Sequence, residues 1–135
     1  MNHTAMRNRA LVRAAREYIE GERLKGRTPT ITETAEAVVD RPAPSYFISF
    51  TPLYNGVCHI LGSSGAVKPT TLSRQRLMDV AERVVKLRQN HANLSLAMAV
   101  TMVMAEGGAP RFYITPSSAK QILARELVTP RQFNF

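Results

Sequence analysis

The chain has 135 residues, enough for one domain or two very small ones, and 44% of them are hydrophobic, as in ordinary globular proteins. Eighteen Lys and Arg against ten Asp and Glu give a net charge of +8, and fourteen of the eighteen cations are Arg. This composition excludes intrinsic disorder. The basic excess favours nucleic acid as a partner, ahead of an acidic protein or anionic lipid.

Cysteine content and hydropathy exclude several further classes. Cys58 is the single cysteine, so no intramolecular disulfide can form. The first nine residues contain no apolar run, which predicts that there is no signal peptide. The longest apolar-rich stretch, residues 96–105, is too short to span a bilayer. We therefore expect a cytoplasmic protein without membrane contact, associated with the nucleoid if it binds DNA, of small bacterial or phage type.

The first predicted helix covers residues 7–24, where apolar side chains recur at helical spacing. Arg9, Arg13 and Arg16 fall on another face of it, at i, i+4 and i+7. Such a stripe is suited to the phosphate backbone of a nucleic acid, and it is equally typical of an ordinary solvated face.

Two further helices are predicted before the middle of the chain. A capping box at residues 30–33 begins the first, and Arg41-Pro42-Ala43-Pro44 ends it. A short aromatic stretch, residues 45–49, leads to a weaker helix over residues 50–61, which Ser49 is placed to cap and Gly56 weakens.

The second half of the chain has the same order of elements. After the linker sequence Gly62-Ser63-Ser64-Gly65, Ser73 is placed to cap a helix ending near Gln89. Ser95 is placed to cap a helix over residues 96–106, and Thr115-Pro116 begins a last helix that ends near Leu127.

An internal repeat emerges when the chain is compared with itself at an offset of 66 residues. The segment Ala43-Pro44-Ser45-Tyr46-Phe47-Ile48-Ser49 then aligns with Ala109-Pro110-Arg111-Phe112-Tyr113-Ile114-Thr115. The helix–helix–aromatic turn–helix order is common to both halves, so we predict a duplication.

Each half resembles a helix-turn-helix DNA-binding unit, although about nine residues, 41–49, stand where such units have a turn of three or four. The Ala-Pro-Arg-Phe-Tyr-Ile-Thr segment is also similar to one in small uncharacterised bacterial proteins. We therefore predict an all-α fold of about six helices in two tandem three-helix units. The predicted boundaries are 1–62 for the first unit, 63–72 for a linker, 73–128 for the second unit and 129–135 for a tail.

The last helix carries the strongest candidate site. Its predicted core positions leave a polar face of side chains that can bind bases and phosphates. Arg111 and Thr115 precede this helix and can bind a phosphate together with its free N–H groups. The candidate nucleic-acid-binding residues here are Arg111, Thr115, Ser117, Ser118, Lys120, Gln121 and Arg125. The same face is also what an ordinary solvated helix would show.

In the first half, Asn55 aligns with Gln121 and His59 with Arg125, so these two residues are secondary candidates beside the Arg9, Arg13 and Arg16 stripe. Residues 1–66 hold eight basic and six acidic side chains, a net +2, whereas residues 67–135 hold ten and four, a net +6. The second half is therefore expected to make the stronger contacts.

Three other features have alternative readings. The aromatic pairs at residues 46–47 and 112–113 are expected in the core, although they could stack on single-stranded bases. The Met-rich helix at 96–105 is expected in the core, with a homodimer or partner contact as the alternative. Cys58 is expected to be a small core residue.

Catalysis has little support in the sequence. His3, His59 and His91 lack the spacing of metal ligands, and Cys58 and His59, as neighbours on a helix, point in different directions. We expect no enzyme, no cofactor and no metal. The predicted function is binding of nucleic acid, most readily duplex DNA, in a transcriptional or accessory role. The alternative is a non-catalytic assembly protein that docks an acidic partner through the Met-rich helix and the aromatic turns.

Overall fold

The computed structural model describes residues 2–63 and 70–127. All regular structure in this part of the chain is helical, which confirms the predicted all-α class and its six helices. The helices are α1 (His3–Leu24), α2 (Ile31–Val38), α3 (Phe50–Gly62), α4 (Leu72–Asn90), α5 (Leu96–Ala105) and α6 (Pro116–Leu127). Most of the predicted linker, residues 64–69, and the predicted tail, 129–135, lie outside the described residues.

Side-chain caps explain where most of the helices begin. Thr30 accepts a hydrogen bond from the N–H of Glu33 at the start of α2, and Ser95 accepts one from Met98 at the start of α5. The cap of α4 is Thr71, two residues before the predicted Ser73. Ser49 precedes α3 but makes no side-chain cap hydrogen bond.

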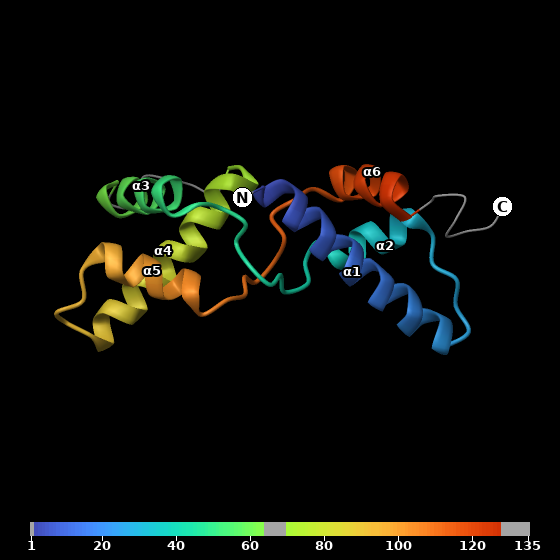
Figure 1. Cartoon of the computed structure of the whole chain (residues 1–135), viewed down its shortest axis with the longest axis horizontal. Helices are drawn as coiled ribbons and strands as arrows, with labels where there is room; N and C mark the ends of the chain where they lie inside the picture. Colours follow the sequence, from blue (N-terminus) through green and yellow to red (C-terminus); the bar gives the residue numbers. More distant parts are fainter. Residues whose placement is uncertain (1, 64–69, 128–135) are drawn as a thin grey trace. The chain divides into compact units, whose positions relative to one another are not determined.

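The six helices form two compact units that do not follow the predicted sequential halves. Unit 1 contains α1, α2 and α6, from the segments up to Pro44 and from Ala109 onward. Unit 2 contains α3, α4 and α5, from Ser45 to Gly108. Each unit thus takes two helices from one half of the chain and one from the other: unit 1 adds α6 to α1 and α2, and unit 2 adds α3 to α4 and α5 (Figure 1).

Each unit has its own apolar core. In unit 1, α1 and α2 bury their small and branched side chains against Leu123 of α6. In unit 2, Leu53 and Val57 of α3 are fully buried with valines of α4 and α5. The fully buried side chains of unit 1 include Leu11, Ala15, Val38, Ala119 and Leu123, and those of unit 2 include Leu53, Val57, Val80, Val84 and Val100.

The two aromatic turns have matching geometry at positions 66 residues apart. Phe47 and Tyr113 have positive φ angles of 53° and 55°, a conformation that non-glycine residues rarely adopt. Tyr46 and Phe112 beside them are 5% and 4% exposed, so the core position expected for the aromatic pairs is confirmed for these two rings, whereas Phe47 and Tyr113 are only half-buried. Such matching backbone strain at aligned positions supports the predicted duplication.

The two aligned alanines that precede these turns pair with each other. The N–H of Ala43 donates to the carbonyl of Ala109 over 2.8 Å, and the N–H of Ala109 donates to the carbonyl of Ala43 over 2.7 Å. This isolated antiparallel bridge ties the segment after α2 to the segment before α6. Phe112 then donates its N–H to the carbonyl of Val39 over 3.1 Å. These bonds fix the direction in which the chain approaches α6 in unit 1.

Candidate nucleic-acid interface

The arginine stripe of α1 is exposed and lines a groove in unit 1. Arg9, Arg13 and Arg16 are all exposed, as expected for a solvated or ligand-binding face. They border a groove of about 780 Å³, which we call the arginine groove, together with Glu17 of α1 and Glu126 of α6. The groove therefore lies where α1 meets α6.

Helix α6 turns its predicted polar face outward. Ser117, Ser118, Lys120, Gln121 and Arg125 are exposed. The apolar positions predicted for its core face, Ala119, Ile122, Leu123 and Leu127, are all buried. Because α6 packs on α1 and α2, the polar face of the last helix and the arginine stripe of the first helix belong to one compact unit.

The start of α6 is already occupied by its own cap. The N–H of Ser118 donates to Thr115 Oγ1 over 3.1 Å, and the two hydroxyl groups lie 3.0 Å apart. The N–H of Ala119 bonds to the carbonyl of Thr115, and Pro116 has no N–H to offer. Because most N–H donors of the first turn already have partners, fewer of them can bind a phosphate at Thr115 than the sequence indicated.

Arg111 stands just before the buried ring of Phe112 and is half-buried. Its Nε is buried and has no hydrogen-bond partner within the described residues. An unpartnered guanidinium nitrogen is unfavourable in a low-dielectric setting, and a bound anion would improve its environment. The buried, unpartnered Nε of Arg111 thus supports the predicted phosphate contact, which stays a prediction.

Two carboxylates temper the positive charge of the groove. Glu17 and Glu126 both line it. Glu126 also forms an ion pair with Arg125, with 3.4 Å between Arg125 Nε and Glu126 Oε1. Both partners of this pair are well exposed, so it contributes at most about 1 kcal/mol and can be broken by a stronger anion.

The secondary candidates Asn55 and His59 lie on α3 and are exposed. Helix α3 belongs to unit 2, so the fold does not gather them into the same unit as Gln121 and Arg125. The regrouping also changes the charge distribution. Unit 1 holds twelve basic and seven acidic side chains, a net +5, whereas unit 2 holds six and three, a net +3. The excess that the sequence placed in the second half belongs mainly to the unit containing α1 and α6.

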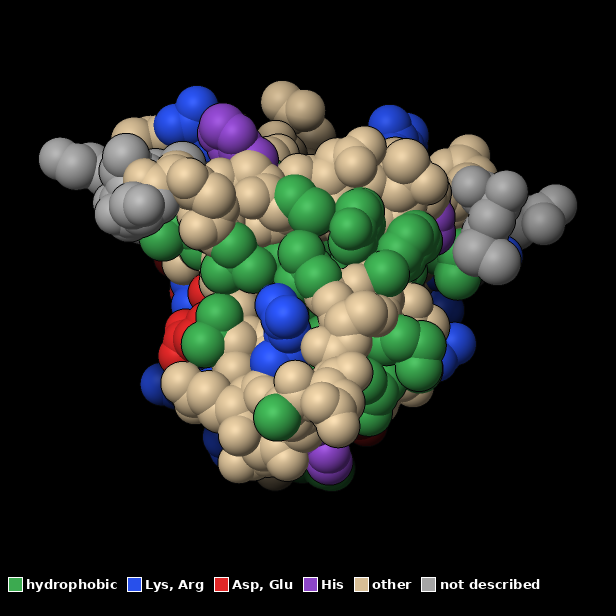
Figure 2. Space-filling view, turned by 90° about the vertical axis from the view of Figure 1, so that its left-hand side faces the viewer, with side chains coloured by type: hydrophobic (Ala, Val, Ile, Leu, Met, Phe, Trp, Pro, Cys, Tyr) green, Lys and Arg blue, Asp and Glu red, His purple; other side chains and the backbone are tan. Residues whose placement is uncertain are grey.

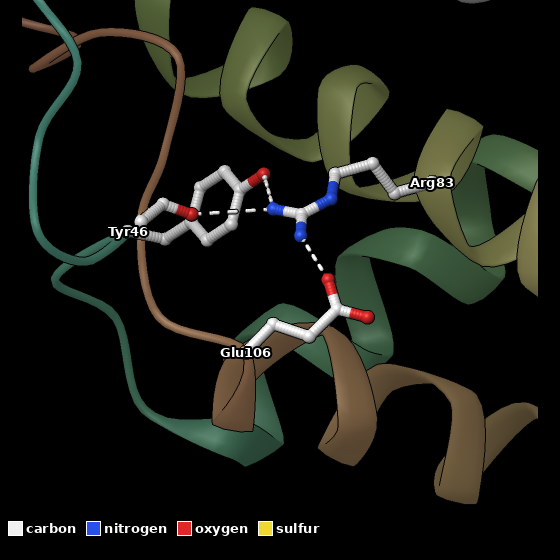
Figure 3. Close-up of polar contacts among 4 residues, drawn as sticks. Tyr46, Arg83 and Glu106 are labelled. Atoms are coloured by element: carbon white, nitrogen blue, oxygen red, sulfur yellow. Dashed lines mark hydrogen bonds and ion pairs between the residues drawn. The ribbon is translucent and has the colours of Figure 1, made fainter.

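An arginine that the sequence analysis did not single out forms the densest polar cluster of unit 2 (Figure 3). Arg83 Nη1 donates to the hydroxyl of Tyr46 over 2.7 Å and to the carbonyl of Gly108 over 3.2 Å. Arg83 Nη2 forms an ion pair with Glu106. Burial opposes the charge of Arg83, but Tyr46 and Glu106 outweigh that effect, and its pKa is raised above the ordinary value.

The signal for this cluster was present in the sequence. Arg83 lies on the long helix α4 in line with Arg76, whose Nη1 donates to the carbonyl of Tyr46 over 3.2 Å. Two arginines seven residues apart on a helix share a face, and that face contacts the aromatic turn. These cations serve the fold of unit 2 and are not free for a phosphate.

An apolar surface crosses unit 2, where Figure 2 shows hydrophobic side chains gathered around a basic one. Met98 is 56% exposed and Met102 is 36% exposed, four residues apart on α5, while Ala99, Val100 and Val103 of the same helix are buried. The expected core role of α5 therefore holds for Ala99, Val100 and Val103, whereas Ala105 is exposed. Two of its three methionines face the solvent instead.

The residues considered for catalysis remain scattered. Cys58 is half-buried and hydrogen-bonds with Tyr54, one turn earlier on α3, which raises the pKa of the Tyr54 hydroxyl. Residues 2–63 and 70–127 contain no group of three His, Cys, Asp or Glu side chains arranged to hold a metal ion. Among the helices of this part of the chain, none is both long and apolar enough to cross a membrane.

Comparison with protein-family models, with curated proteins and with solved structures finds no match for this chain.

Proposed function

We propose that unit 1 binds nucleic acid, with duplex DNA as its target, through the arginine stripe of α1 and the polar face of α6. One observation carries the proposal: the fold puts α6 on α1, so that Arg9, Arg13, Arg16 and the exposed side chains of α6 belong to one unit. The role would be transcriptional or accessory. The wider resemblance to a helix-turn-helix protein remains part of this proposal.

The spacing of the stripe suits a phosphate backbone. Residues i to i+7 of a helix span about 10 Å, which is close to the rise of three base pairs. Three exposed guanidinium groups at Arg9, Arg13 and Arg16 can therefore contact phosphates along one strand over about three base pairs. Arg111 would add a further contact on the chain leading to α6.

The exposed face of α6 supplies base readout. Gln121 can pair with adenine and Arg125 with guanine through two hydrogen bonds each, and both lie on one face, four residues apart. Ser118, Ser117 and Lys120 would contact phosphates or neighbouring bases. Release of Arg125 from Glu126 costs little, because that pair is exposed to solvent.

The experiment measures anisotropy of a labelled random-sequence duplex as salt is varied. Replacement of Arg9, Arg13 and Arg16 by Gln should lower affinity at 100 mM salt at least about tenfold and reduce the log–log salt slope by up to about 2.7. The matched control replaces Arg74, Lys86 and Arg88 of unit 2, also exposed, by Gln. It removes the same charge, and we expect less than a threefold change.

Equal losses in the two triple variants would show that charge alone matters and would overturn the assignment to unit 1. Binding to every nucleic acid weaker than about 100 µM at 100 mM salt would overturn the nucleic-acid proposal itself. A double variant, Gln121→Ala with Arg125→Ala, should lose sequence discrimination while the salt slope changes by no more than about 1.

The alternative function, docking of an acidic protein partner, is favoured by one observation in unit 2. Met98 and Met102, four residues apart on α5, expose their thioether side chains to solvent. Met98→Ser with Met102→Ser should then abolish the interaction with that partner and leave DNA affinity unchanged. A homodimer through the same surface would be detected as loss of dimer in analytical ultracentrifugation of this variant.

A further inference from the structure

Unit 1 contains a second hollow beside Phe112, distinct from the arginine groove although Arg13 and Glu17 border both. Its volume is about 320 Å³. The methyl groups of Ala10 and Ala14 lie on its α1 side, Pro42 lies on its α2 side, and Phe112 contributes a buried aromatic ring. We call this hollow the Phe112 cavity.

At the aligned positions in unit 2, two arginines lie against the aromatic turn. At the offset of 66 residues Phe112 corresponds to Tyr46, Glu17 to Arg83 and Ala10 to Arg76. The Arg83 guanidinium lies 5.7 Å from the centroid of the Tyr46 ring and hydrogen-bonds to its hydroxyl, and Arg76 bonds to the Tyr46 carbonyl. Unit 2 thus shows how a guanidinium fits beside the ring of this turn.

In unit 1 the guanidinium is missing, and so is its hydroxyl partner, because Glu17 stands at the position of Arg83 and Phe112 at that of Tyr46. Asp40 stands at the position of Glu106, which pairs with Arg83, and Pro42 stands at the position of Gly108, which offers its carbonyl. Glu17 replaces Arg83 and adds a carboxylate at the rim of the cavity. Arg76, Asp79, Arg83 and Glu106 sum to zero charge, whereas Ala10, Arg13, Glu17 and Asp40 sum to −1.

From this difference we infer that the Phe112 cavity is a binding site for the arginine side chain of a partner protein. The guanidinium would lie beside the Phe112 ring, with its methylenes against Ala10 and Ala14, and would pair with the Glu17 carboxylate. This site and the proposed nucleic-acid interface bind ligands of opposite charge: the Phe112 cavity takes a cation, and the arginine groove takes an anion.

Arg13 separates the two sites and offers a way to tell them apart. It borders both hollows and carries the charge that an incoming arginine would meet as repulsion. Arg13→Gln should therefore tighten arginine binding and weaken DNA binding at the same time. Failure of one proposal would leave the other measurable in the same variant.

The test is a titration of the full ¹⁵N-labelled chain with N-acetyl-arginine methylamide, followed by amide chemical shifts. We expect saturable shifts at Ala14, Glu17 and Phe112, and binding about fivefold weaker in Glu17→Gln. The matched control is Glu36→Gln, an exposed glutamate on α2 that borders neither hollow, which should change nothing. Glu17→Arg would place a guanidinium in unit 1 as in unit 2 and should abolish binding.

Two further probes complete the test. The neutral isostere, N-acetyl-citrulline methylamide, should not bind, and N-acetyl-lysine methylamide should bind more weakly because it lacks the planar fork. Equal binding of either probe, or equal effects of Glu17→Gln and Glu36→Gln, would overturn the proposal. Circular dichroism identifies any variant that fails to fold. In that case the proposal is decided by Arg13→Gln and Glu17→Gln, because both substitutions are at exposed positions.

Discussion

The two units use arginine in opposite ways. In unit 2, Arg76 and Arg83 turn toward the aromatic turn and are held by Tyr46, Gly108 and Glu106. In unit 1 the aligned positions carry Ala10 and Glu17, and Arg9, Arg13 and Arg16 of α1 are exposed instead. The difference teaches that net charge is a poor guide to binding, because Arg76 and Arg83 use their guanidinium groups within the fold while Arg9 and Arg13 are exposed to solvent.

The largest effect that separates the units should come from Arg83→Ala. This change leaves the Tyr46 hydroxyl and the Gly108 carbonyl without their charged donor, and we expect a loss of about 2 kcal/mol in the free energy of unfolding. Urea denaturation followed by circular dichroism measures it. The control, Glu17→Ala at the aligned position of unit 1, should stay within about 0.5 kcal/mol. Equal losses would show that the two turns are held alike.

A smaller difference should emerge where the helices of each unit cross. A Cβ on Gly56 would lie 2.5 Å from Cδ2 of Leu77, so Gly56→Ala must displace that side chain and should lower the free energy of unfolding by about 1 kcal/mol. Unit 1 has Ile122 at the aligned position. The control Gly21→Ala meets no atom within 4 Å and should stabilise the protein by about 0.5–1 kcal/mol.

Thermal melts of the two glycine variants should therefore shift in opposite directions. A rise in melting temperature for Gly56→Ala would mean that Leu77 moves aside at no cost and that the crossing in unit 2 is loosely packed.

The smallest effect concerns the aligned residues that precede α3 and α6. Thr115 caps α6 through the N–H of Ser118, whereas Ser49 makes no side-chain cap bond to α3. Thr115→Ala should cost about 0.5–1 kcal/mol and Ser49→Ala only a few tenths, as measured by urea denaturation. The reverse order would indicate that α3 depends on its first turn more than α6 does.

Local signals in the sequence predicted the helices well. The Thr30, Ser95 and Thr115 signals each mark a helix start in the structure, and the predicted end of the last helix at Leu127 agrees with the last residue of α6. Caps and apolar spacing act over a few residues, so they can be recognised without knowledge of the tertiary fold. The apolar face predicted for α6 is confirmed for the same reason.

Which helices pack together was beyond these signals. The buried residues Leu53 and Val57 of α3 align with Ala119 and Leu123 of α6, so either helix offers a similar apolar face to either partner pair. A repeat therefore leaves two assemblies with nearly the same local pattern. The bridge between Ala43 and Ala109, which joins positions 66 residues apart, has no local signature in the sequence.

The candidate site was predictable in its residue types and not in its grouping. Arg9, Arg13 and Arg16 could be placed on one face by helical spacing alone. They share a unit with Gln121 and Arg125 only because α6 packs with α1 and α2 instead of with α4 and α5. For the same reason α3, with Asn55 and His59, belongs to unit 2. The Phe112 cavity has no signature in the sequence of unit 1 alone. It could be interpreted only by comparison with unit 2, where Arg76 and Arg83 stand at the positions of Ala10 and Glu17.

The order of segments has a consequence for synthesis of the protein. Unit 2 is continuous, from Ser45 to Gly108, and can fold as soon as it leaves the ribosome, whereas unit 1 lacks α6 until Leu127 has been made. At about 5–20 residues per second, α1 and α2 wait roughly 4–18 s for the completion of α6. The basic unit therefore matures last, and its core stays open to chaperones or to premature partners during that interval.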